Sequence, residues 1–137
     1  MAITNTAAFA QTTKTGSVVA TAASSINTDT PSEAVLIGTA GADGAILTKL
    51  SAIPRATVGD ALLYLYISKD SGTTKRVVDS VLLASRTVSS TVVNEPVVFE
   101  RITESTPIRL EAGDVMYVSS AVALSSGIAF SAEWTDF

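Results

Sequence analysis

Apolar residues alternate with other side chains at intervals of two along much of the chain. The clearest case has Leu63, Leu65 and Ile67 alternating with Tyr64 and Tyr66. A period of two places successive side chains on opposite faces of a strand, whereas one face of a helix repeats about every 3.6 residues. No segment beyond the first 32 residues keeps a helical period, so the pattern predicts strands.

Turn signals divide this pattern into about eight or nine short strands, roughly ten residues apart. Asp70–Thr74, which contains a glycine, separates two β-rich runs and predicts a hairpin. The expected strands lie at 35–37, 46–53, 63–68, 76–83, 87–93, 97–99, 108–111, 115–118 and 128–134. Many short strands with regular turns are typical of sandwiches and jelly rolls. We therefore predict an all-β fold, an antiparallel and jelly-roll-like β-sandwich.

The first 32 residues differ from the rest of the chain. They are rich in Thr, Ala, Ser and Asn, and Lys14 and Asp29 are their only charged residues. One interpretation is a loosely ordered terminus. The other is an extended arm that becomes ordered on a neighbouring subunit, because a solvated tail normally carries more charge and proline. The predicted organisation is an extended N-terminal arm at 1–32 and a sandwich domain at 33–137.

Several aromatic and apolar residues are candidates for a subunit interface. Tyr64 and Tyr66 occupy the second face of their strand, and tyrosine is enriched at interfaces because it combines apolar area with a hydroxyl. A loop of the same sandwich could equally cover both rings, and a sugar-binding platform is a third option. The candidate interface residues are Tyr64, Tyr66, Phe9, Val18, Val19 and Trp134.

The composition narrows the classes of partner. Charged residues make up only 16% of the chain, against about 25% in typical soluble domains. A weakly charged surface is easily dehydrated against another protein, which favours oligomerisation or stable docking. The net charge is −4 and the basic residues are scattered, so no basic stripe for nucleic acid is expected.

Neither a membrane segment nor a secretory signal is expected. The longest uncharged stretch, Val115–Ala132, contains several serines and a Ser-Ser-Gly turn, so it is interpreted as two strands and a turn. Residues 1–10 lack both a basic region and a continuous apolar core.

The residue types argue against catalysis. The chain has no histidine and no cysteine, which removes the usual general base, thiolate chemistry and cysteine-based zinc sites. Nucleotide-binding glycine loops and the Gly-x-Ser-x-Gly motif are also absent from the sequence. Thirteen acidic residues could supply a glycosidase pair, but any chain of this size could do so. We expect no enzyme, no cofactor and no metal.

The segment from Leu50 to Phe137 resembles small structural proteins encoded by tailed phages and prophages. The resemblance rests on Ala52–Thr57, Leu65–Arg76 and Leu110–Asp114. A Gly-Asp pair followed by Val-x-Tyr-Val is also common in jelly rolls of trimeric proteins. Proteins of this kind decorate or cement phage heads, or belong to tails and fibres.

The resemblance implies a virion protein that is assembled in the host cytoplasm. The expected role is capsid decoration or cementing by a homo-oligomer, with a homotrimer as the expected state. Its partners would be further copies of itself and the major capsid protein or another virion protein. The alternative is a receptor-binding or carbohydrate-binding module of a tail or head fibre.

Overall fold

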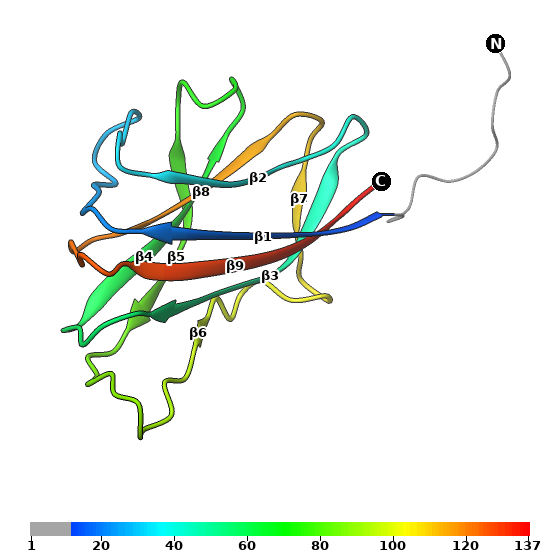
Figure 1. The fold of residues 1–137 in the computed structure, drawn as a ribbon. Helices are drawn as coiled ribbons and strands as arrows, with labels where there is room; N and C mark the ends of the chain where they lie inside the picture. The colour runs from blue at the N-terminus through cyan, green and yellow to red at the C-terminus, as the bar shows by residue number, and fades with distance from the viewer. Residues whose placement is uncertain (1–11) are drawn as a thin grey trace, which may run out of the picture.

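The computed structural model describes residues 12–137, and these residues form nine strands and no helix. The strands are β1 (Thr12–Ala20), β2 (Val35–Thr39), β3 (Ala45–Pro54), β4 (Ala61–Ser68), β5 (Arg76–Leu83), β6 (Val97–Val98), β7 (Ile108–Leu110), β8 (Val115–Ser120) and β9 (Ile128–Asp136). They build two antiparallel sheets that pack face to face (Figure 1). The predicted all-β antiparallel sandwich is therefore confirmed.

The strand order places the earliest described strands next to the latest ones. One sheet has the order β1-β9-β3, and β3 then pairs with both β7 and β6 at different points along its length. The other sheet has the order β2-β8-β4-β5. First and last strands are thus neighbours, as are the second and the second-to-last strands. Such nesting is compatible with a jelly roll, in which two Greek keys are wound together.

The core lies between the two sheets and follows the period-two pattern of the sequence. In β9, the alternating positions Ile128, Phe130, Ala132 and Trp134 are all buried, whereas Ser131 between them is exposed. Large side chains from both sheets meet these residues. Among the fully buried ones are Leu47, Leu50, Leu63, Leu65, Leu83, Phe99, Met116 and Val118. Burying each of them contributes about 1.5–3 kcal/mol.

Residues 12–20 belong to the sandwich, which corrects the expected arm at 1–32. β1 pairs with β9 over its whole length, from Thr12 opposite Asp136 to Ala20 opposite Ile128. The face of β1 that turns towards the core lacks a row of large apolar residues: Ala20 is buried, Gly16 and Val18 are half-buried, and Lys14 is exposed. The strand signal is therefore weak. The sandwich therefore begins well before residue 33.

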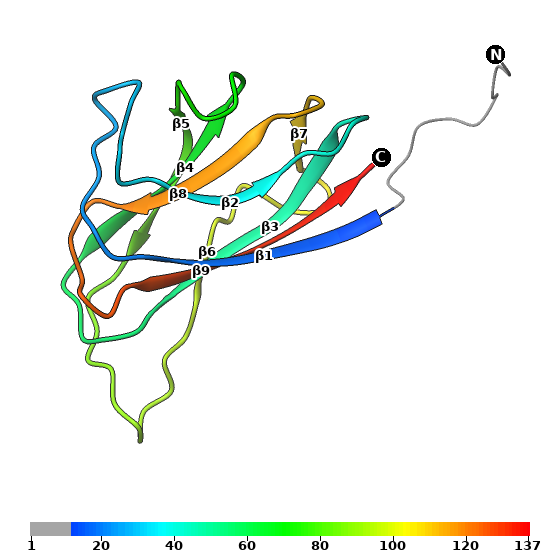
Figure 2. The ribbon, with the colours of Figure 1, turned by 45° about the horizontal axis from the view of Figure 1, so that its top comes forward.

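The strand expected at 87–93 is wrong, because this stretch is part of the long connection between β5 and β6. The connection extends away from the body of the sandwich (Figures 1 and 2). Thr, Val and Ser have the right propensity for a strand, but no neighbouring strand pairs with residues 87–93. Val92 and Val93 are consequently exposed.

Candidate interaction surface

The two tyrosines of β4 are buried beneath a segment of their own chain. Tyr66 is fully buried and Tyr64 is 8% exposed, with their ring centroids 6.1 Å apart. The Ser119 hydroxyl donates a hydrogen bond of 2.9 Å to the Tyr66 hydroxyl, and Ser24 Oγ lies 3.3 Å from the same oxygen. Each ring therefore lies inside the subunit, and the Tyr66 hydroxyl is satisfied there.

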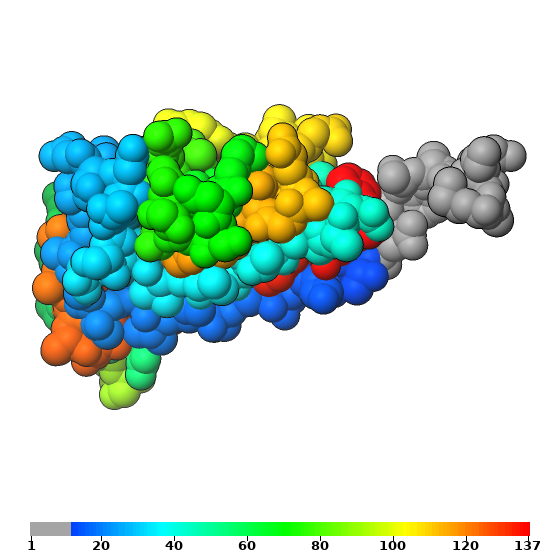
Figure 3. All heavy atoms as spheres, turned by 90° about the horizontal axis from the view of Figure 1, so that it is seen from above, coloured from blue at the N-terminus to red at the C-terminus, as the bar shows by residue number. Residues whose placement is uncertain are grey.

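The connection between β1 and β2, residues 21–34, provides this cover, and we call it the covering segment. Its Ser24 N–H donates to the carbonyl of Ser120 at 2.9 Å, which anchors it beside β8. Further along, the Asp29 carbonyl accepts from the Lys75 N–H at 2.8 Å, next to the β4–β5 hairpin. Figure 3 shows the covering segment lying against that hairpin. Of the three interpretations of the tyrosines, the structure agrees with the one in which a loop of the same sandwich covers them.

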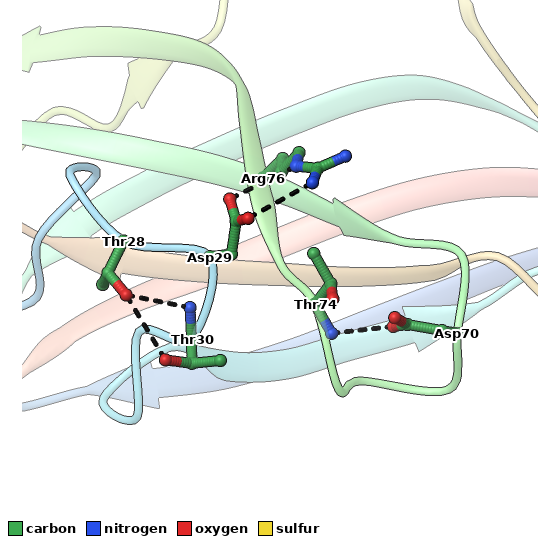
Figure 4. Close-up of polar contacts among 6 residues, drawn as sticks. All are labelled: Thr28, Asp29, Thr30, Asp70, Thr74 and Arg76. Atoms are coloured by element: carbon green, nitrogen blue, oxygen red, sulfur yellow. Dashed lines mark hydrogen bonds and ion pairs between the residues drawn. The ribbon is translucent and has the colours of Figure 1, made fainter.

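An ion pair holds the far end of the covering segment (Figure 4). The Asp29 carboxylate accepts from Nε and from Nη2 of Arg76, each at 3.2 Å. This two-point contact lowers the pKa of Asp29, first through the hydrogen bond and then through the positive charge of Arg76. The covering segment is thus tied to the first residue of β5.

Trp134 is a core residue of β9 rather than an exposed interface residue. Its ring lies against Gly38 of β2, where an added Cβ would stand 2.5 Å from the Trp134 ring. It also passes close to Gly16 of β1. Trp134 Nε1 has no hydrogen-bond partner among residues 12–137. Two glycines therefore make the space that buries the only tryptophan of the chain.

The other interface candidates are distributed differently. Phe9 lies outside the described residues. Val18 and Val19 are consecutive half-buried residues of β1, so their side chains point to opposite faces, and Val18 packs against the core. With Tyr64, Tyr66 and Trp134 buried, the structure does not bring the five candidates among residues 12–137 together into one surface. A sugar-stacking platform made of those three rings is likewise not present.

The outer face of β4 and β5 instead exposes a group of aliphatic side chains, which we call the aliphatic patch. Leu62 of β4 is directly opposite Leu82 of β5, and they are 44% and 54% exposed. Ile26 of the covering segment, Leu62 and two valines of β5 line one open hollow of about 310 Å³. The members of the aliphatic patch are Ile26, Leu62, Val77, Val78 and Leu82.

Two ion pairs stand at the border of the aliphatic patch. Arg101 Nη1 donates to Asp79 Oδ1 at 2.7 Å, and the Asp79 side chain is buried while Arg101 stays exposed. The second pair is Asp29 with Arg76, described above. Each pair joins one acid to one base, so these two pairs add no net charge to the border.

The outer edge of β5 is poorly suited to pair with another strand, because its geometry is irregular and one of its N–H groups already donates a hydrogen bond. The register shifts by one residue in β5, between Asp79 and Val77, which is a β-bulge. The Ser80 N–H donates to the Asp79 carboxylate at 2.8 Å. Bulges and edge charges are devices by which native sheets avoid edge-to-edge pairing. A partner protein would therefore bind this side of the molecule through the side chains on the outer face of β4 and β5 rather than through the backbone edge of β5.

A second hollow, of about 480 Å³, lies near the turn that joins β4 and β5. Apolar Ile67 and Val78 contribute to its wall. Its charged lining residues are Lys69, Asp70, Arg76, Arg109 and Asp114. The mixture of signs gives this hollow no strong preference for an anion or a cation.

Most of these charges already have structural partners. Lys69 Nζ donates to Asp114 at 2.9 Å, a bond that raises the pKa of Lys69. Asp70 accepts from the Thr74 N–H at 2.7 Å within the hairpin turn, and this bond lowers its pKa (Figure 4). Among residues 12–137, no group of three or more acidic side chains is placed to hold a metal ion. The charges act mainly in shaping the turns.

The aliphatic patch was missed by sequence reasoning, although its signal was present. The β5 run Val77-Val78-Asp79-Ser80-Val81-Leu82-Leu83 has apolar residues at both odd and even positions. A strand with one solvated face would alternate. The extra apolar positions therefore indicated a second face that also avoids water.

The comparisons with known proteins give no relative. No protein-family model matches the sequence, and neither the curated proteins nor the solved structures give a match. Within residues 12–137, no helix is long and apolar enough to cross a membrane.

Proposed function

We propose that this protein is a structural component of a tailed-phage virion, a decoration or cement protein of the head. The aliphatic patch is the observation that carries the proposal. Exposed aliphatic side chains from two neighbouring strands and the covering segment suit a chain that is buried against other proteins. The low fraction of charged residues supports the same role, because little ionic desolvation opposes such burial.

The proposed mechanism is stabilisation by mass action. A protein that binds the assembled shell and not its dissociated parts shifts the equilibrium towards the shell. A rigid two-sheet sandwich suits this role, since little conformational freedom is lost when a pre-ordered surface binds. The proposed partners are further copies in a homo-oligomer, with a homotrimer as the expected state, and the major capsid protein. The proposed location is the virion, assembled in the host cytoplasm.

Immunogold electron microscopy tests the proposal. Antibodies raised against the purified protein would be applied to tailed-phage particles from cells that make it. We expect gold on the heads of intact particles. Gold confined to fibres would instead favour the receptor-binding alternative, and particles free of the protein in both microscopy and mass spectrometry would contradict both roles. Particles from a deletion strain are the control for antibody specificity.

A further inference from the structure

We infer that the aliphatic patch is the surface through which copies of this chain associate. In this arrangement the patch of one copy lies against the same patch of its neighbours around a rotation axis. The inference deepens the proposed function and rests on it for the existence of an oligomer. Leu62 and Leu82, directly opposite each other and both about half exposed, form the centre of the contact.

The contact uses side chains rather than backbone. Strand addition at β5 would need free N–H and C=O groups along a regular edge. The bulge at Val77 and Val78 breaks that regularity, and the Ser80 N–H is taken by Asp79. The aliphatic side chains on the outer face have no such impediment. The geometry therefore selects packing of one outer face against another.

The charges of the molecule make the aliphatic patch a suitable place for a further copy of this chain to bind. The whole chain carries a net charge of −4, so two copies that meet through an average part of the surface repel each other. Around the aliphatic patch, Asp29 is neutralised by Arg76 and Asp79 by Arg101. A contact across a twofold axis must be complementary to itself, and in a trimer the side chains that lie at the threefold axis likewise meet their own copies. An aliphatic face flanked by these two internally paired charges meets that requirement.

The test is sedimentation velocity of the full-length protein and its variants. Leu82→Glu and Leu62→Glu each place a charge in the proposed contact, and the like charges of neighbouring copies would meet near the axis. We expect self-association to weaken at least about tenfold in each variant. Val93→Glu is the matched control, because Val93 is 83% exposed and lies in the β5–β6 connection outside the aliphatic patch. This control should sediment like the wild-type protein.

Cross-linking provides a second readout that does not depend on a disruptive charge. The natural chain has no cysteine, so Leu82→Cys introduces a single reactive thiol. A short bifunctional maleimide should join Leu82→Cys subunits efficiently, and should join Val93→Cys subunits poorly. Circular dichroism and thermal unfolding would show that each variant keeps the wild-type fold.

The outcomes separate this inference from the proposed function. A wild-type protein that is monomeric at about 100 μM, or folded Leu62→Glu and Leu82→Glu variants that associate normally, would overturn the inference. If the monomer still binds phage heads through the same leucines, the shell protein is the occupant and only the inference fails. If the oligomer forms through the patch but is absent from particles, only the proposed virion role fails.

Discussion

Gly38 matters at the scale of single residues because its missing side chain is the space that Trp134 fills. In Gly38→Ala, the new methyl would stand 2.5 Å from a ring that the core holds in place. We expect a loss of about 1–3 kcal/mol in the free energy of unfolding, as for other overpacked cores. Urea denaturation would measure it. Gly59→Ala is the matched control, since nothing lies within 4 Å of the added Cβ, and an equal loss there would contradict the account.

The Tyr66 hydroxyl is the second residue-scale test. Tyr66→Phe removes the acceptor of the bond from Ser119, whose side chain is itself buried. We expect unfolding free energy to fall by about 1–3 kcal/mol, because a buried hydroxyl loses its partner. Ser24→Ala should cost less, since Ser24 is only half-buried and its contact is longer, at 3.3 Å. Equal unfolding midpoints for Tyr66→Phe and wild type would argue against a structural role for this hydroxyl.

The sequence predicted the burial of a side chain where the pattern of its own strand determines it, and failed where a distant segment of the chain determines it. The period-two alternation around Leu63 and Leu65 predicted a strand, and both leucines are fully buried in β4. Trp134, which was predicted as an interface residue, is buried in the core instead. The covering segment contacts the Tyr66 hydroxyl through Ser24, which lies some 40 residues earlier in the chain. No local sequence pattern indicates where that segment lies, so the sequence did not decide whether the tyrosines belong to the core or to an interface.

At the scale of elements, β1 is the least predictable strand. Gly16 replaces a large apolar residue on the core side of β1, and the space beside Gly16 is filled by the Ile37 carbonyl oxygen and the Trp134 ring. Propensity misled in the opposite direction at residues 87–93, where β-rich residues lack a strand to pair with. Pairing partners, rather than local preference, decide both cases.

Hydrogen exchange tests the place of β1 in the sandwich. Nine residues of β1 pair with β9, so their hydrogen-bonded amides should exchange slowly. The amides of residues 87–93 should exchange much faster and serve as the internal comparison. Fast exchange throughout 12–20, with β9 still protected on its other side by β3, would restore the interpretation of this stretch as an arm.

The Asp29–Arg76 pair makes the covering segment sensitive to acid. The pair lowers the folded-state pKa of Asp29 below its ordinary 3.8, so the charged form stabilises the fold above that value. This contribution is lost as pH falls through the lowered pKa. Asp29→Asn should therefore lower the unfolding temperature near neutral pH and flatten its decline between about pH 5 and about pH 2.

Calorimetry at a series of pH values would measure this difference. Asp43→Asn, at an exposed acid in the β2–β3 turn, is the control and should leave the decline unchanged. A decline in Asp29→Asn as steep as in the wild-type protein would show that the ion pair does not couple folding to pH.

At the scale of the whole molecule, the packing of the two sheets against each other leaves the aliphatic patch exposed. The core explains why the chain folds. It does not explain why Leu62 and Leu82 should both face outward on neighbouring strands. If another protein surface covers this face, Leu62 and Leu82 are buried in the assembly, and the proposed virion role provides such a partner.

Electron cryo-microscopy of the phage particle tests the central claim most directly, because one map shows both where the chain lies and which face is covered. The account predicts density for the sandwich on the head shell, with the outer face of β4 and β5 packed against the same face of a neighbouring copy. A map in which the chain is present but this face is turned to solvent, or in which the chain is absent from the particle, would contradict it.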